Sequence, residues 1–277
     1  MRIRPDFVEA VQERFGAEAH ELAGTDPEPI NEWVKDKTLA RIPTLFDSPL
    51  DPMTAMVLVN TVFFKGSWVT VFDVARTRRS EFRNFSSRLP CDMMYKKDRM
   101  MYMENDQLQA VRLPYSDEKT WATIILPKME GPAEVASTLE QTWEDLNWEL
   151  RGRTVELRLP RFRLSAGGSM KSALRQLGLK ETLEPRGGFL KMSDDLSVHL
   201  SEVMHKATLE VNEEGTVAAA ASGAVMKAKS IAPKPPVAMT VDRPFLFILS
   251  DGLGSVHFLG QIVVPELAGL EATLSEL

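Results

Sequence analysis

Residues 213–243 form a stretch of about thirty residues that shows neither helical nor strand periodicity, although the segments on both sides do. So long a gap is uncommon inside a compact domain, and where one occurs it is usually a functional loop or a disordered segment. Its first half, GTVAAAASGA, consists of small residues, and its second half contains Pro233, Pro235 and Pro236. Prolines favour extended backbone, so the second half is kept out of helices. Any fold for this chain must accommodate a long exposed segment.

The small-residue half of this segment has more than one possible structure. It could be a flexible linker or a turn of helix, since alanine is the strongest helix former. It could also form a central strand, with Thr216, Ala218, Ala220 and Ser222 on one face. Small side chains on both faces would let such a strand enter between existing strands without overpacking.

Elsewhere the apolar pattern predicts a mixture of helices and strands. We expect helices over residues 5–15, over residues 29–46 with an end near Pro43, over residues 133–150, and over residues 169–179 with Gly178 closing the last turn. We expect strands over residues 101–104, 107–114, 121–126 and 154–164, the last with one solvated face. Residues 54–64 are apolar almost throughout, so we expect a strand that is buried on both sides.

The remaining segments complete a single mixed domain. Residues 198–211 are expected to hold a short helix that leads into a strand. The apolar runs PFLFILSD and SVHFLGQIVVPE, joined by a turn that contains glycine, predict a core hairpin. Because no linker or internal repeat divides the chain, we expect one α+β domain over residues 1–277.

Composition argues against several classes of protein. The net charge of -6 and the pI near 5.4 argue against nucleic-acid binding, which needs a concentrated basic face. The densest basic cluster, in ARTRRSEFR, is interrupted by Glu81 and is expected to be a solvated loop or an edge strand. No apolar run is long enough to span a membrane. The single cysteine, Cys91, rules out an internal disulfide.

The residues also form no recognisable catalytic or metal centre. The histidines are dispersed, and none has a metal-binding spacing: His20, His199, His205 and His257. The fragment GGSMK lacks the second glycine of a nucleophile elbow, and Ser169 is expected to cap the helix that follows. The glycines of residues 252–255 lie between two strands, where a turn is expected rather than a nucleotide-binding loop. We therefore expect neither an enzyme nor a bound metal or cofactor.

Several sequence blocks, in one consistent chain order, resemble the serpin family. The stretch HKATLEVNEEGTVAAAAS, residues 205–222, is similar to the serpin hinge signature, an acidic-Gly-Thr sequence followed by alanines. Further serpin-like blocks are NEWV, LVNTVFFKGSW, LRLPRFRL, RPFLF and FLGQIVVPE, which begin at residues 31, 58, 157, 243 and 258. The resemblance covers nearly the whole chain. It implies a serpin-like fold with a large mixed central β-sheet, flanking helices and an exposed reactive loop, here residues 213–243.

The resemblance implies inhibition of a serine protease by a suicide-substrate mechanism. The protease would form an acyl-enzyme on the loop, which would then insert into the large sheet; serpins are a recognised example of such strand addition. About a dozen new backbone hydrogen bonds at roughly 1 kcal/mol each would supply on the order of 10 kcal/mol. Counted along the family's loop from Glu213, the bait residue is Lys229, followed by Ser230, with Lys227 as the alternative. A lysine suits a trypsin-like protease, whose specificity pocket holds an aspartate.

The resemblance also implies which residues control insertion. The hinge, where the loop leaves the sheet, comprises Glu213, Glu214, Gly215, Thr216, Val217, Ala218, Ala219, Ala220 and Ala221. Asn60 and His205 match the shutter, the place beneath the sheet where strands part. Lys65 and Trp68 match the breach, the top of the sheet where the loop first enters, and Arg161 is expected to pair with Glu213 there.

Against the family pattern, the helices and early strands that precede residue 5 are absent. We therefore expect an N-terminally truncated serpin that inhibits poorly by itself, whereas the full-length protein is expected to be a monomer with a trypsin-like protease as its partner. No nucleic-acid or membrane partner is expected. An extracellular location is favoured, with a cytoplasmic one as the alternative. A non-inhibitory serpin, such as a carrier, chaperone or storage protein, and an inactive remnant stay open as alternatives. Non-inhibitory members usually carry bulky or charged residues or proline in the hinge, and residues 216–224 contain none.

Overall fold

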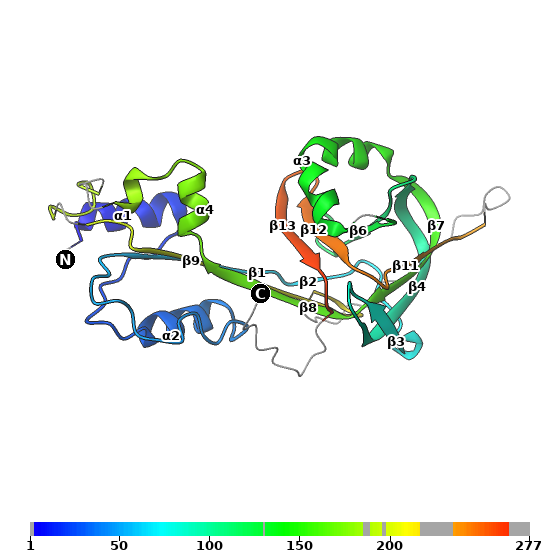
Figure 1. Cartoon of the computed structure of the whole chain (residues 1–277), viewed down its shortest axis with the longest axis horizontal. Helices are drawn as coiled ribbons and strands as arrows, with labels where there is room; N and C mark the ends of the chain where they lie inside the picture. The colour runs from blue at the N-terminus through cyan, green and yellow to red at the C-terminus, as the bar shows by residue number, and fades with distance from the viewer. Residues whose placement is uncertain (1–2, 130, 185–188, 196–197, 217–234, 266–277) are drawn as a thin grey trace. The chain divides into compact units, whose positions relative to one another are not determined.

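Figure 1 shows the chain as a computed structural model, which describes residues 3–129, 131–184, 189–195, 198–216 and 235–265. The chain divides into two compact units. Unit 1 consists of Met1–Phe63 and Ser165–Thr208, and unit 2 consists of Phe64–Leu164 and Leu209–Leu277. The single domain expected over residues 1–277, with its reactive loop at residues 213–243, stays a prediction.

Unit 1 combines short helices with a parallel pair of strands. Its helices are α1 (Pro5–Phe15), α2 (Glu28–Lys37), α4 (Lys171–Gln176) and the 3-10 turn η2 (Glu181–Leu183). Strand β1 (Val57–Phe63) pairs in parallel with β9 (Glu202–Val211), which also pairs with β8 (Phe162–Ser169). The β1–β9 ladder runs from Val57 opposite Glu202 to Phe63 opposite Thr208, so β1 and β9 are direct neighbours over this length.

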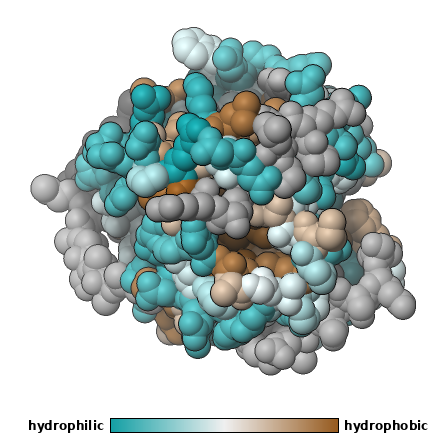
Figure 2. Space-filling view, turned by 90° about the vertical axis from the view of Figure 1, so that its left-hand side faces the viewer, coloured by the Kyte–Doolittle hydropathy of each residue, from teal (hydrophilic) through white to brown (hydrophobic). Residues whose placement is uncertain are grey.

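Helix α2 packs on one face of the β1–β9 pair. The contact is made by apolar side chains of the helix, of the segment after it and of both strands: Val34, Ile42, Leu45, Val59 and Met204. Because side chains alternate along a strand, Leu58 and Asn60 point to the face opposite Val59. Leu58 is 53% exposed, so β1 is not buried on both sides as predicted. Figure 2 shows apolar side chains at the surface among hydrophilic ones.

Some predicted elements of unit 1 are confirmed and others are wrong. Helices α1 and α4 are confirmed, and Gly178, with a φ of 97°, follows the end of α4 as predicted. Helix α2 ends at Lys37 and not near Pro43, because Leu39 and Ala40 adopt left-handed backbone angles that a right-handed helix cannot contain. The predicted helix before β9 is also wrong: residues 198–201 form neither helix nor strand, and the Ser201 N–H donates to the Met56 carbonyl at 2.9 Å.

Unit 2 is built on an eight-stranded sheet in the order β11–β7–β4–β5–β6–β12–β13, with β3 paired to β4. The strands are β3 (Arg78–Arg83), β4 (Arg88–Glu104), β5 (Leu108–Pro114), β6 (Thr120–Pro127), β7 (Arg151–Pro160), β11 (Val237–Thr240), β12 (Phe245–Asp251) and β13 (Val256–Ile262). Helix α3 (Pro132–Glu149) covers part of this sheet, and its Val135 and Leu139 share a buried cluster with Ile125 and Leu246. Two short strands, β2 (Gly66–Ser67) and β10 (Gly215–Thr216), and the 3-10 helix η1 (Val74–Arg76) complete the unit.

The predicted hairpin is confirmed as β12–β13, and the arginine-rich segment is confirmed as an edge strand, β3. Three other predictions for unit 2 need correction. Strand β4 is 17 residues long instead of four, because β3, β7 and β5 supply partners along its length. The strand predicted over residues 154–164 is divided between β7 and β8 at Arg161. Residues 213–243 are not irregular throughout, since β10 and β11 lie within them.

Candidate functional site

The chain leaves β9 through a tight turn that leads into β10. Asn212 holds this turn: its Oδ1 accepts hydrogen bonds from the backbone N–H groups of Glu214 and Gly215 at 3.0 and 3.2 Å. An asparagine side chain bonded to the backbone two residues ahead is typical of a turn. Strand β10 therefore turns back between β9 and β2 and runs antiparallel to both.

The close approach of β10 to β2 requires glycine at position 215. Gly215 has a φ of 150°, and a Cβ on it would lie 2.1 Å from the Gly66 carbonyl oxygen and 2.6 Å from Ser67 Cα. Both would be overlaps with backbone atoms, which cannot rotate aside as a side chain can. The glycine of the predicted hinge is thus required by the geometry of this pairing.

Thr216 is completely buried in unit 2 and hydrogen-bonded to a tyrosine. Its Oγ1 lies 2.6 Å from the Tyr115 hydroxyl oxygen. Burial raises the pKa of the Tyr115 hydroxyl, so it remains protonated near neutral pH. The Tyr115 ring stacks on Trp68 with 4.4 Å between ring centroids, and Trp68 Nε1 donates to the Asn212 carbonyl at 3.0 Å. Trp68, which the sequence placed at the breach, therefore contacts the turn that carries the hinge.

Glu213 is buried and held by two donors. Arg161 Nε lies 2.9 and 2.7 Å from the two carboxylate oxygens of Glu213, and the Thr77 hydroxyl donates to Oε1 at 2.5 Å. Burial alone would raise the pKa of the Glu213 carboxyl, but the hydrogen bonds from Arg161 and Thr77 outweigh it and hold the pKa below its usual value. The hydrogen bonds to Glu213 in turn raise the pKa of Arg161. The expected ion pair is thus present. It ties the hinge turn to Arg161, the residue between β7 and β8.

The two residues assigned to the shutter meet in unit 1. His205 Nδ1 lies 3.0 Å from Asn60 Oδ1, and the two residues are opposite each other in the β1–β9 ladder. On the other side of β9, a Cβ on Gly167 would lie 2.2 Å from the His205 carbonyl oxygen, so β8 needs a glycine here. Lys206 Nζ donates to the Thr44 carbonyl at 3.0 Å and ties the segment after α2 to β9. These contacts join β1, β9 and the segment after α2, while the shutter role of Asn60 and His205 stays a prediction.

Of the remaining predicted site residues, Lys65 is described and the loop positions are not. The Lys65 side chain is exposed and forms no hydrogen bond or ion pair within the described part of the chain. Residues 217–234 lie outside the described residues, and they include hinge positions 217–221 and the predicted bond between Lys229 and Ser230, as well as the alternative Lys227. Their assignments stay predictions.

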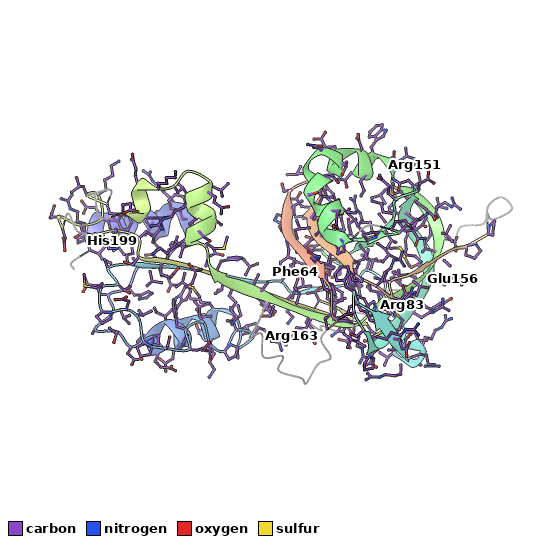
Figure 3. All side chains as sticks on the ribbon, viewed as in Figure 1. Phe64, Arg83, Arg151, Glu156, Arg163 and His199 are labelled. Atoms are coloured by element: carbon purple, nitrogen blue, oxygen red, sulfur yellow. The ribbon has the colours of Figure 1, made fainter. Side chains whose placement is uncertain are left out.

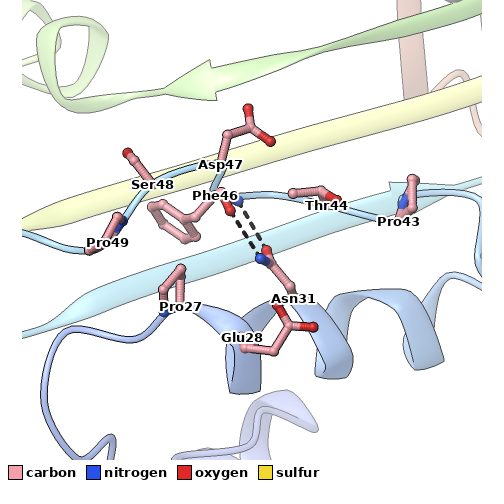
Figure 4. Close-up of a pocket in the computed structure, with 9 residues that line it drawn as sticks. All are labelled: Pro27, Glu28, Asn31, Pro43, Thr44, Phe46, Asp47, Ser48 and Pro49. Atoms are coloured by element: carbon pink, nitrogen blue, oxygen red, sulfur yellow. Dashed lines mark hydrogen bonds between the residues drawn. The ribbon is translucent and has the colours of Figure 1, made fainter.

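A shallow cavity of about 350 Å³ lies in unit 1 between α2 and the segment that follows it (Figure 4). Asn31 spans the two walls: its Oδ1 accepts from the Leu45 and Phe46 N–H groups at 2.9 and 3.0 Å, and its Nδ2 donates to the Phe46 carbonyl at 3.0 Å. These bonds serve the packing of α2, and we assign no ligand to the cavity. Within the described residues, no group of three or more His, Cys, Asp or Glu side chains could hold a metal ion. No helix among them has the length and hydropathy of a membrane span.

Residues 1–265 match the family model described as Serpin (serine protease inhibitor). The chain belongs to the serpin family. The family is described as one of protease inhibitors and not of catalysts, in agreement with the prediction that the chain is not an enzyme.

Curated serpins match this chain over most of its length. Iripin-2 from Ixodes ricinus is 38% identical over 269 residues, which are 92% of this chain and 67% of that protein. Leukocyte elastase inhibitor from Sus scrofa is 34% identical over 282 residues, which are 94% of this chain and 73% of that protein. The chain spans only 61% of the related serpin iripin-5 and 63% of a serpin-like protein from Thermococcus kodakarensis.

Solved serpin structures share the fold. Human thyroxine-binding globulin in complex with thyroxine superposes with a TM-score of 0.86 at 24% identity, covering 96% of this chain and 72% of that one. Serpin48 from the insect Tenebrio molitor gives a TM-score of 0.81 at 24% identity, with the same coverage. These likenesses confirm the predicted serpin-like fold with its large mixed β-sheet. The absence of N-terminal helices stays a prediction.

Sequence reasoning missed three residues of this serpin's hinge region. Asn212 adjoins the predicted hinge, and the Asn-x-x-Gly pattern is a turn signal that could have identified it. Tyr115 is 101 positions from its partner Thr216, and Thr77 is 136 positions from Glu213. No local pattern links residues so far apart, and only the folded arrangement of the strands reveals them.

Proposed function

We propose that this serpin inhibits a trypsin-like serine protease as a suicide substrate. The protease would be acylated by the loop at Lys229, and the cleaved loop would insert between β1 and β9. The observation that supports this is the position of β10, which already lies between β9 and β2, whereas β1 and β9 pair directly with each other. An extracellular, monomeric inhibitor without a nucleic-acid or membrane partner belongs to the same proposal, with a cytoplasmic location as the alternative.

The register of β10 supports insertion along this path. Thr216 lies opposite Val211 on one side and Gly66 on the other. A strand continued in the same register would bring residue 219 opposite Phe63 and Thr208, which are themselves partners in the β1–β9 ladder. It would bring residue 225 opposite Val57 and Glu202, the far end of that ladder. Residues 219–225 would thus enter without any shift of register between the strands that part.

The composition of the loop suits this path. Residues 218–224 are all alanine, serine or glycine, so neither face of the new strand would be overpacked. Insertion would replace one ladder by two, and about a dozen added backbone hydrogen bonds at roughly 1 kcal/mol each would supply on the order of 10 kcal/mol. This free energy would drive the distortion of the captured protease.

A covalent adduct with trypsin would test the proposed inhibition. The protein, in the longest form that its gene encodes, is incubated with trypsin and analysed on a denaturing gel. We expect an SDS-resistant complex that is lost in Lys229→Glu and retained in the matched variant Lys227→Glu, because only the bait residue forms the ester. Loss in Lys227→Glu instead would move the bait residue. Cleavage of the loop without an adduct would favour a non-inhibitory carrier, chaperone or inactive remnant.

A further inference from the structure

The turn between β3 and β4 carries a modification motif that the proposed inhibition does not use. Asn84, Phe85 and Ser86 form the sequence Asn-x-Ser, in which x is not proline. This sequence is the acceptor motif for N-linked glycosylation, and an acceptor lies on a surface loop of the folded protein. No other asparagine of the chain is followed by serine or threonine two positions later. Position 84 is therefore the one candidate acceptor in this sequence.

Residues 84–87, called here the Asn84 turn, are held by the Asn84 side-chain oxygen. Asn84 Oδ1 accepts hydrogen bonds from the backbone N–H groups of Ser86 and Ser87 at 3.0 and 2.6 Å. The Asn84 N–H also donates to the Ser87 carbonyl at 3.0 Å. An asparagine oxygen bonded to the backbone two residues ahead is a common turn-forming contact, and aspartate can make it equally. The turn thus depends on the side-chain oxygen of Asn84 and not on its nitrogen.

The two groups that glycosylation uses are the ones that the Asn84 turn leaves available. The acceptor atom is Asn84 Nδ2, which forms no hydrogen bond within the part of the chain that the structure describes. The hydroxyl of the motif, Ser86 Oγ, has only a long contact of 3.5 Å to Asn84 Oδ1. By contrast, the Nδ2 of Asn31 in unit 1 donates to the Phe46 carbonyl at 3.0 Å. A sugar on Asn84 would therefore displace no hydrogen bond of the described residues.

The Asn84 turn is exposed at its tip and fixed at its base. Residues 85–87 are exposed, and Phe85 is 71% exposed. At the base, Arg83, labelled in Figure 3, is the last residue of β3. Its N–H donates to the Asp242 carbonyl at 2.7 Å, and its Nη2 lies 2.7 Å from Asp242 Oδ2. A bulky glycan at this tip would cover the apolar Phe85 ring without disturbing the packing of unit 2.

We propose that Asn84 carries an N-linked glycan. Asn84 Nδ2 attacks C1 of the first sugar of a lipid-diphosphate-linked oligosaccharide. The bond from Nδ2 to C1 forms, the bond from C1 to the diphosphate oxygen breaks, Nδ2 releases one proton, and the lipid diphosphate leaves. The Ser86 hydroxyl is the third-position group that the transferring enzyme requires. The proposal rests on the proposed extracellular location, since this transfer takes place in the secretory pathway.

The test measures occupancy of Asn84 in the secreted protein. The protein, in the longest form that its gene encodes, is directed into the secretory pathway of insect cells by a cleavable signal peptide. The product is treated with peptide-N-glycosidase F, which removes N-linked glycans and converts each occupied asparagine to aspartate. We expect a shift to lower apparent mass on a denaturing gel, and aspartate at position 84 in peptides of the treated sample only.

The variants separate the motif from the turn. Asn84→Asp keeps the oxygen that holds the turn but lacks the acceptor nitrogen, and it should lose the mass shift that depends on this site. Ser86→Ala should also lose the glycan, whereas Ser86→Thr should keep it. The matched control is Ser87→Ala, which removes a hydroxyl that donates to Asn84 Oδ1 at 3.0 Å but lies outside the motif. This control should keep its glycan.

Two outcomes would overturn the proposal. One is a secreted protein in which Asn84 is never converted by the glycosidase. The other is full conversion in Ser86→Ala, because conversion without the motif would come from deamidation and not from an attached glycan. The same gene product with its native N-terminus tests the location separately. If it stays inside the cell while the signal-directed form is glycosylated at Asn84, the extracellular location fails and the acceptor site stands.

Discussion

Tyr115 and Thr216 share a buried hydrogen bond of 2.6 Å that joins the end of β5 to the start of the reactive loop. Thr216 is the last described residue before the loop, and it is fully buried. Under the proposed mechanism, strand insertion would continue from β10, whereas β1 and β9 pair directly with each other in unit 1.

Thr216→Arg should convert the inhibitor into a substrate. Among the described residues, the side-chain partner of the fully buried Thr216 is the neutral Tyr115 hydroxyl, and burying an unpaired charge there would cost several kcal/mol at the insertion step. Under the proposed mechanism, acylation would occur at Lys229, thirteen residues further along, and should continue at a near-normal rate. We expect many more inhibitor molecules to be consumed per trypsin inactivated, whereas Thr216→Val should change this ratio little. A ratio that stays near one in the arginine variant would rule out insertion through this hinge.

Tyr115→Phe should loosen the hinge without unfolding unit 2. The change keeps the ring that stacks on Trp68 but leaves the buried Thr216 hydroxyl without its partner, at a cost of about 1–3 kcal/mol. We expect faster amide hydrogen exchange over residues 211–216. The control is Tyr102→Phe, which removes a hydroxyl that donates to Glu104 elsewhere in unit 2. Equal exchange in both variants would show that the Tyr115 hydroxyl does not hold the hinge.

Gly215→Ala should separate β10 from β2. A methyl group at this position would overlap the Gly66 carbonyl oxygen, and backbone must move to relieve the clash. Gly168→Ala is a close control, because Gly168 has a similar φ of 148° but no atom within 4 Å of the added Cβ. We expect Thr216 to lose amide protection in the first variant only. Retained protection of Thr216 in Gly215→Ala would show that the β10–β2 pairing tolerates a Cβ at this position.

Stability should fall in acid through Glu213. Its carboxyl pKa is lower in the folded state than its usual 4.5, so the unfolded state binds more protons between the two values. The stabilisation is present above about pH 4.5 and is lost as the pH falls through the lowered value. Glu213→Gln should therefore cost about 1–3 kcal/mol at pH 7 and much less in strong acid, as measured by denaturant unfolding. Glu214→Gln serves as the control, because the neighbouring Glu214 carboxylate forms no ion pair within the described residues. The prediction fails if both variants lose the same stability at every pH.

Lys96→Met should stabilise the protein, and most at neutral pH. Lys96 Nζ donates to the Thr70 carbonyl and lies 5.3 Å from the Phe72 ring centroid, and burial lowers its pKa from 10.5 to about 8. Because the unfolded state binds more protons between these values, the stability of the unaltered protein rises with pH across that window. We expect a gain of about 1 kcal/mol at pH 7 that shrinks towards pH 10, since one pKa unit corresponds to about 1.4 kcal/mol. Lys65→Met, at an exposed position, should show no such trend. A gain independent of pH would point to packing instead of charge.

Elements whose pattern is local could be predicted well. Helix α1 and the β12–β13 hairpin follow from apolar spacing over a few residues. The end of α2 could not be predicted, because left-handed angles at Leu39 and Ala40 carry no signature in those residue types. Strand β11 has only four residues and is stabilised by its pairing with β7, a partner about eighty residues away in the chain.

The sequence by itself determined the family, the order of the conserved-looking blocks, the small-residue hinge and the pairing of Arg161 with Glu213, because these depend on residue types at matched positions. Only the tertiary structure decided that Thr216 lies buried against Tyr115, that β10 pairs with β9 and β2, and that Thr77 donates to Glu213. The physical reason is that such contacts join residues far apart in the chain. Strand order and register set them, and both depend on the packing of the whole unit.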